Sequence, residues 1–222
     1  MPRPPTVLLL AGIACSTPEP DPPPVDFDEL PAAQREAAVA KQAAARASAQ
    51  PSDPDAALEH TRKAAMGMGK GLKQRLQAAM KAGGPAEAVH ACQIQAPKVA
   101  SDTQSRTAVR AGRSSLRLRN PKNADAPAWV QAWLTAQGER PAEGVSGLSE
   151  VVASGSDRVA RVLLPLTVEP VCLTCHGAPE TLDASVQKRL TELYPEDKAT
   201  GYQAGDLRGA LWAEYTLPSA GG

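Results

Sequence analysis

Residues 163–177 read LLPLTVEPVCLTCHG, an apolar segment that runs directly into two cysteines and a histidine. Cys172 and Cys175 are three positions apart, and His176 follows the second thiol. This is the spacing of a c-type haem attachment site, in which each sulfur bonds to the porphyrin and the histidine binds the iron. The sequence therefore predicts one covalent haem c, attached through Cys172 and Cys175, with His176 as an axial ligand.

Two other kinds of site use the same cysteine spacing. A thioredoxin-type redox pair is expected after the first strand of a βαβ unit, whereas this pair lies three quarters of the way along the chain. A zinc site needs a second, similarly spaced pair of ligands, and the sequence contains none. Both alternatives stay open, and haem c is favoured over them.

The apolar segment before the cysteines predicts part of a β-hairpin. Residues 149–153 and 158–167 flank the turn-like sequence SGSD, so we expect them to be antiparallel strands. Residues 115–119, SLRLR, alternate between polar and apolar and predict another strand. A last strand is expected over residues 207–216, after a Gly-rich loop. The sheet predicted from these segments is small and mainly antiparallel.

Helical patterns come before the first of these strands and again before the last one. Asp53-Pro54 is a typical helix start, and apolar residues then recur at helical spacing as far as Gly83-Gly84, which should end the helix. A second helix is expected over residues 85–101, with Cys92 facing inward, and a shorter one over residues 183–193. Helices followed by a small sheet make an α+β fold.

The first of these helices contains the unusual sequence MGMGKG, residues 66–71. Each of the three glycines weakens a helix by up to about 1 kcal/mol. We therefore expect that a flat body such as a haem, or another helix, approaches the chain there, or that the helix is broken.

The N-terminal fifty residues predict export. Residues 1–14 combine one positive charge, a short apolar run and small residues before Cys15, which is typical of a lipoprotein-type signal. Ordinary secretion is the alternative. Residues 15–31 are Pro-rich and predict an extended tether, and residues 32–50 predict an Ala-rich helical arm. We expect a periplasm-facing protein held to a bacterial membrane by a lipid on Cys15, in the compartment where haem c is attached.

The charge balance argues against a nucleic-acid partner, because 24 Lys and Arg face 24 Asp and Glu. The most basic stretch, residues 106–119, contains five arginines. One or two of them could pair with the haem propionates, and Arg113 is the first choice. A run of this kind is more often the solvent face of a strand, so this alternative stays open.

His176 leaves the opposite face of the iron to a second ligand. The sequence offers Cys92, His90, His60, Met66, Met68 and Met80. Met or His is the usual partner in cytochromes c. Cys92, however, is left without a role in a compartment that oxidises exposed thiols. Its alternative role is that of a small, buried apolar side chain.

Four ordered motifs within residues 55–217 resemble a bacterial family of single-haem c-type domains with a PAS-like fold. The motifs are AVHACQIQAPKVA (88–100), GRSSLRLRNPKNADAPAW (112–129), LLPLTVEPVCLTCHG (163–177) and GYQAGDLRGALW (201–212). The resemblance implies a PAS-like domain that encloses the haem. It also implies that Cys92, on the helix before the sheet, is the second axial ligand.

The same resemblance implies redox or small-ligand sensing, because the family also forms the extracytoplasmic input of signalling proteins. A thiolate stabilises ferric iron, so we expect Cys92 to leave on reduction and free a position for CO or NO. A lipid-anchored electron carrier is the alternative, with a redox or signalling partner at the membrane in either case. A haem enzyme such as a peroxidase is less favoured, because only His90 could serve as a distal acid or base.

Overall fold

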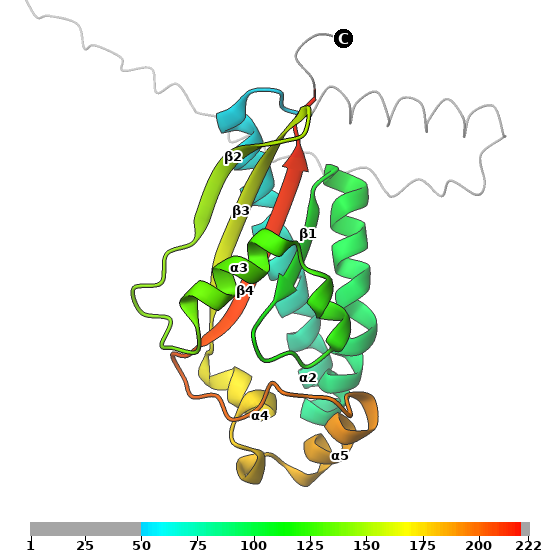
Figure 1. The fold of residues 1–222 in the computed structure, drawn as a ribbon. Coiled ribbons are helices and arrows are strands. Elements are labelled where there is room, and N and C mark those ends of the chain that lie inside the picture. Colours follow the sequence, from blue (N-terminus) through cyan, green and yellow to red (C-terminus); the bar gives the residue numbers. More distant parts are fainter. Residues whose placement is uncertain (1–49, 219–222) are drawn as a thin grey trace, which may run out of the picture. The chain divides into compact units, whose positions relative to one another are not determined.

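Residues 50–218 are described by the structure, a computed structural model, and they begin with a long helical segment (Figure 1). The predicted export signal (1–14), the Pro-rich tether (15–31) and, apart from Gln50, the Ala-rich arm (32–50) lie outside the described residues. None of the helices within residues 50–218 has both the length and the apolar character needed to cross a bilayer.

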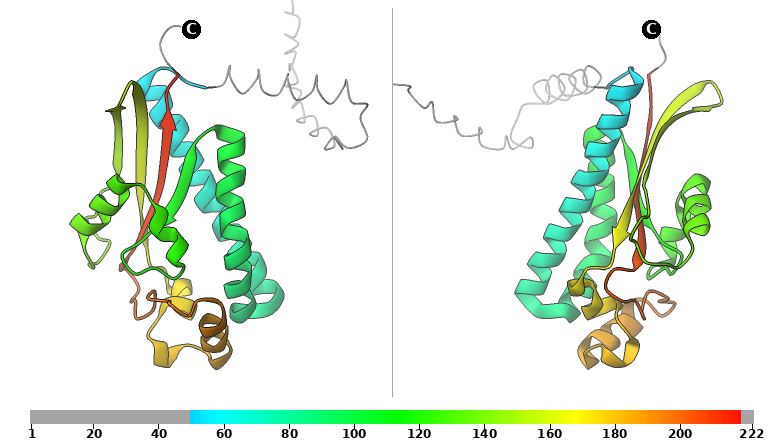
Figure 2. Two further views of the ribbon diagram at one scale, coloured as in Figure 1. Left: turned by 45° about the vertical axis from the view of Figure 1, so that its right-hand side comes forward. Right: turned by 90° about the vertical axis from the view of Figure 1, so that its left-hand side faces the viewer.

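Helix α2 (Pro54–Thr107) is a hairpin of two arms, which lie alongside each other in Figures 1 and 2. Asp53 caps its start by accepting hydrogen bonds from two backbone N–H groups of the first turn. Gly84 leaves the helical conformation with a φ of +75°, so the predicted break at the glycine pair is confirmed. The second arm continues to Thr107, past the predicted end near residue 101. His60 joins the two ends, because its Nε2 lies 2.8 Å from the carbonyl oxygen of Thr107.

Four antiparallel strands form the sheet in the order β1-β4-β3-β2. They are β1 (Arg110–Ser114), β2 (Leu148–Ser154), β3 (Asp157–Thr167) and β4 (Leu207–Thr216). The predicted hairpin and last strand are confirmed, and so is the α+β class. The strand predicted over residues 115–119 is wrong. Pairing of β1 with β4 stops at Ser114, where Gly209 takes a φ of +144°, and the chain then turns to contact the loop after α5.

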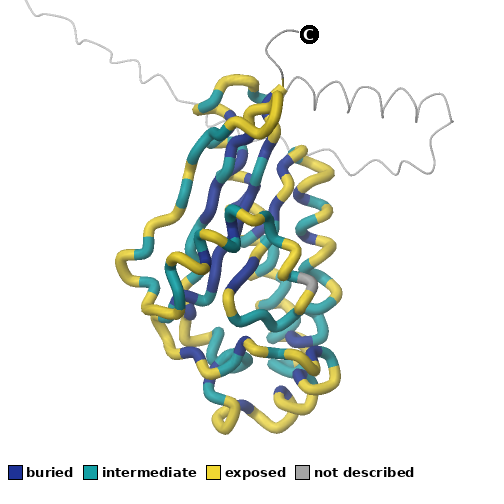
Figure 3. The backbone as a smooth tube through the Cα atoms, in the orientation of Figure 1, coloured by how far each residue is buried: buried dark blue, intermediate teal, exposed yellow. Residues whose placement is uncertain are grey.

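Helices cover both faces of this sheet (Figure 2). Helix α3 (Ala128–Gln137) packs Val130 and Leu134 against one face, and α2 packs against the other. Figure 3 shows that burial follows the two central strands, β3 and β4. Helix α5 (Ala184–Leu193) confirms the helix predicted over residues 183–193, and the Asp183 carboxylate caps its start. The remaining elements are η2 (Pro121–Asp125), η3 (Pro170–Cys172), α4 (Leu173–His176) and η4 (Pro179–Thr181).

The glycines of residues 66–71 lie in unbroken helix, and two of them face close neighbours. A Cβ on Gly69 would lie 2.6 Å from Leu211 Cδ1, so the absence of a side chain lets strand β4 approach the first arm. A Cβ on Gly71 would lie 3.5 Å from Val99 on the second arm. A strand and a helix therefore approach this glycine sequence, and the predicted alternative of a broken helix is wrong.

Gly209 supplies a test of how the sheet is built. Alanine there would be strained at a φ of +144°, and its Cβ would clash with the Ser114 carbonyl oxygen and lie 2.7 Å from Ser115 Cβ. We expect Gly209→Ala to lower the free energy of unfolding by at least about 2 kcal/mol. Urea denaturation measures the loss.

The control is Gly67→Ala, because a Cβ on Gly67 meets nothing within 4 Å. We expect this change to raise the free energy of unfolding by up to about 1 kcal/mol through helix propensity. A neutral Gly209→Ala would contradict the close contact between β4 and the chain after β1.

Candidate functional site

The two cysteines and the histidine lie on two short helical turns that follow β3. Cys172 ends η3, and Cys175 and His176 belong to α4, so all three side chains sit within about one and a half turns. All three residues are partly buried, and both thiols are free. Gly177 ends the helix where a Cβ would lie 2.7 Å from the Leu173 carbonyl oxygen, so the chain can turn tightly behind the histidine.

One nitrogen of the His176 ring is fixed by the backbone. Nδ1 lies 2.6 Å from the carbonyl oxygen of Ala199, and a carbonyl oxygen can only accept, so Nδ1 carries the proton. Burial, together with the positive charges of Arg119 and Arg208, lowers the pKa of His176 to about 2. The ring is therefore neutral, and its Nε2 accepts no hydrogen bond from residues 50–218. This is the form of imidazole that binds a metal ion.

The loop between α5 and β4 holds the CxxCH turns in place. The N–H of Gly201 donates to the Gly177 carbonyl at 2.7 Å, and the N–H of Tyr202 donates to the His176 carbonyl at 3.0 Å. The ring of Tyr202 meets the His176 ring edge-on, with centroids 6.3 Å apart. The guanidinium of Arg117 lies over the Tyr202 ring, 3.8 Å from its centroid. The histidine backbone and side chain are thus both supported by this loop.

A nearly buried ion pair supports the same loop. Arg119 Nε donates to Asp197 Oδ2 at 3.0 Å, and the two side chains are only 13% and 10% exposed. Arg119 also donates to the carbonyl oxygens of Cys175 and Ala199. Asp197 in turn accepts a 2.7 Å hydrogen bond from the Ala199 N–H. The pair therefore fixes the residue whose carbonyl holds His176.

Cys92 lies next to this site, although it is eighty positions before Cys172 in the chain. Burial raises the pKa of the Cys175 thiol, and the neighbouring Cys92 raises it further against the lowering effect of Arg119. Burial and Cys92 likewise raise the pKa of Tyr194. Val89, one turn before Cys92, is buried against α5 and Tyr194, and Cys175 packs against the same cluster. The fold therefore brings Cys92 to the CxxCH turns.

Four other predicted ligand candidates have different surroundings. His60 bonds to Thr107 and packs edge-on against Tyr215, and Met68 belongs to the core between α2 and the sheet. Met66 is 57% exposed. His90, partly buried, lies 3.5 Å from the Glu87 carboxylate within its own helix.

Arginines gather around the histidine. Arg113 is exposed on β1, and its charge contributes to the lowered pKa of His176 after burial, Arg119 and Arg208. Arg208 was missed by the sequence analysis. Its Nη1 donates to Ser115 Oγ at 2.8 Å, and burial lowers its pKa to about 10. The sequence feature that could have indicated Arg208 is its position in the motif GYQAGDLRGALW, next to Gly209, where the pairing of β1 with β4 ends.

The model of the Tll0287-like family, described as Tll0287, matches residues 31–214. This chain belongs to the Tll0287-like family. The crystal structure of the cyanobacterial haem protein Tll0287 is similar at 22% identity, over 70% of this chain and 92% of that chain, with a TM-score of 0.49. None of the curated proteins compared with this Tll0287-like chain matches it.

The support of the histidine can be tested through Asp197. Asp197→Ala leaves Arg119 nearly buried without its counter-charge, so we expect the free energy of unfolding of this Tll0287-like protein to fall by about 3 kcal/mol. Chemical denaturation measures it. The matched control is Glu192→Ala, which removes an exposed ion pair with Arg189 and should change stability little. Equal effects of the two changes would contradict the supporting role of Asp197.

Proposed function

We propose that this protein binds one haem c covalently through Cys172 and Cys175, with His176 as an axial iron ligand, and that it senses redox state or a small ligand. The observation that carries the proposal is the neutral His176 ring, held at Nδ1 by Ala199 and free at Nε2, beside two free thiols. Membership of the Tll0287-like family, which shares its name with a cyanobacterial haem protein, supports a haem at this site.

The side chains around the CxxCH turns suit the separate parts of a haem. The two thiols match its vinyl groups in spacing, and the imidazole matches the iron. Arg113, Arg119 and Arg208 supply positive charge on the side of His176, which suits the anionic propionates. A bound haem supplies an iron that changes oxidation state. The arrangement of thiols, imidazole and guanidinium groups around one point is what this proposal requires.

Cys92 is the proposed second axial ligand. It belongs to the second arm of α2, whereas His176 belongs to α4, so the two would bind from different elements. Cys92 lies close enough to contribute to the raised pKa of both Cys175 and Tyr194, which supports this role. We propose that Cys92 is bound in the oxidised protein and leaves on reduction, because thiolate favours the ferric state. Departure of a ligand on a helical arm would link redox state to the position of that arm.

The location of this function is also a proposal. The lipoprotein-type signal of residues 1–14 and the Cys15 that follows it support a protein exported to the periplasm and anchored by lipid. A PAS-like domain in that position would act on a redox or signalling partner at the membrane.

Covalent attachment is the first test. Expression in a host with c-type cytochrome maturation should give a protein whose mass is increased by one haem and whose haem resists acid-acetone extraction. Cys172→Ala/Cys175→Ala should abolish the increase, whereas the control Cys92→Ala should keep it. A colourless wild type, produced beside a cytochrome c that matures normally in the same cells, would overturn the proposal.

The second test concerns Cys92. We expect Cys92→Ala to retain the haem but lose the low-spin thiolate signal in EPR, because the anionic ligand is gone. The control is His90→Ala, which removes the neighbouring imidazole and should keep that signal.

In the reduced wild type, CO should bind readily. Reduced protein that stays six-coordinate and ignores CO would contradict sensing and favour an electron carrier.

A further inference from the structure

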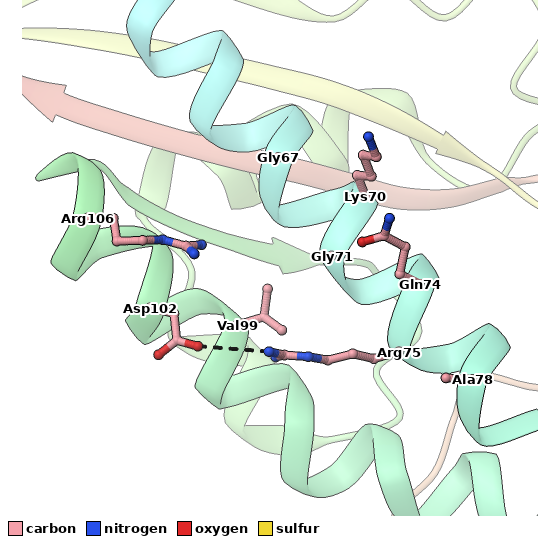
Figure 4. Close-up of a pocket in the computed structure, with 9 residues that line it drawn as sticks. All are labelled: Gly67, Lys70, Gly71, Gln74, Arg75, Ala78, Val99, Asp102 and Arg106. Carbon is pink, nitrogen blue, oxygen red and sulfur yellow. Dashed lines mark ion pairs between the residues drawn. The ribbon is translucent and has the colours of Figure 1, made fainter. Parts of the chain in front are cut away.

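A cavity of about 530 Å³, open to solvent on one side, lies between the two arms of α2 (Figure 4). Its residues on the first arm recur at helical spacing, and they include Gly67, Lys70 and Arg75. Those on the second arm include Asp102 and Arg106. This volume is in the range of small-molecule sites. The cavity shares no lining residue with the CxxCH turns and their supporting loop.

Packing does not account for the glycine at position 67. Gly69, two residues later, makes room for Leu211 of the sheet, but a Cβ on Gly67 would meet nothing within 4 Å. Glycine weakens a helix relative to alanine, so a helix that only had to pack would gain from a side chain at position 67. Because Gly67 lines the cavity and has no side chain, it leaves that part of the cavity open.

The charges that line the cavity are unbalanced. Lys70, Arg75 and Arg106 contribute three positive charges, and Asp102 contributes one negative charge. Arg75 and Asp102 are 4.0 Å apart, at the limit of an ion pair. Within residues 50–218, no carboxylate lies within 4.0 Å of the Lys70 ammonium or the Arg106 guanidinium. The lining therefore favours an anion.

Arg75 has an unused hydrogen-bond donor. Its Nη1 is buried, and no acceptor within the described residues 50–218 bonds to it. A buried donor without a partner is costly, and that nitrogen has no surface open to the cavity. The Arg75 side chain as a whole is 40% exposed, so a carboxylate in the cavity can pair with the exposed part of the guanidinium. Figure 4 shows Arg75 and Arg106 reaching from opposite arms toward the space between them. Two guanidinium groups on opposite walls suit a molecule with an anionic group at each end.

We propose that this cavity binds a small organic dicarboxylate. One carboxylate pairs with Arg75 and the other with Arg106, and Lys70 adds a third positive charge. Val99 and Ala78 supply an apolar wall for the short carbon chain between the carboxylates. The guanidinium fork of each arginine matches a carboxylate, and the positions of the two arginines on opposite walls favour a molecule with an anionic group at each end over a single anion. The site is independent of the proposed haem.

Calorimetric titration of the full-length holoprotein at low ionic strength tests this proposal. Succinate is the probe, and acetate and inorganic phosphate are compared with it. We expect saturable 1:1 binding of succinate, at least tenfold tighter than binding of acetate or phosphate. Arg75→Gln and Arg106→Gln should each weaken succinate binding at least tenfold, and Asp102→Asn should strengthen it because the opposing charge is removed. Lys63→Gln is the charge-matched control, since Lys63 is 73% exposed beside Glu59 and should leave binding unchanged.

Gly67→Leu separates loss of the site from loss of the fold. A leucine at position 67 enters open space and favours helix, so thermal stability should be kept or raised while succinate binding is lost. The proposal is overturned if the wild type does not bind succinate, if Arg75→Gln binds as well as the wild type, or if Gly67→Leu binds unchanged. Phosphate binding as tight as succinate binding would assign the cavity to phosphate and would also overturn it.

Discussion

The hydrogen bond from His176 Nδ1 to the Ala199 carbonyl is the constraint on which the site depends. It decides which ring nitrogen keeps its proton and therefore which one remains free. Asp197 and Arg119 support this bond by fixing the backbone around Ala199, and the Gly201 N–H supports it by bonding to the turn behind the histidine. A two-turn motif of five residues thus gains a defined orientation from a loop more than twenty residues later in the chain.

Strand β4, which follows that loop, packs the sheet against the α2 hairpin. Strand β4 approaches the first arm of α2 at Gly69, and it faces β1 where Gly112 opposes the large ring of Trp212. A Cβ on Gly112 would lie 2.6 Å from the Trp212 ring, and a Cβ on Gly69 would lie 2.6 Å from the end of the Leu211 side chain, which would have to move. The α2 hairpin packed there then carries Cys92 toward the CxxCH turns at one place and borders a separate cationic cavity at another.

Local patterns explain which features could be predicted from the sequence. The hairpin before the cysteines, the last strand, the glycine break and the helix over residues 183–193 each depend on residues close together in the chain, and all four are confirmed. The strand predicted over residues 115–119 is wrong, because pairing with β4 stops next to Gly209. Gly209 lies almost a hundred residues later in the chain, and the local alternation of residues 115–119 carries no information about it. Arg208 and Asp197 were missed for the same reason, because their roles come from contacts across the fold.

The two proposed iron ligands differ in how firmly the protein holds them. His176 is held by its ring nitrogen, its own carbonyl and the turn behind it, and it lies next to a thiol proposed to bond to the haem. Cys92 is carried by a helical arm that joins the first arm at Gly84 and is positioned by the packing of Val89 on α5. If one ligand leaves when the iron is reduced, this difference in support makes it Cys92. The arm of α2 is then the element through which a change at the iron would reach the rest of the fold.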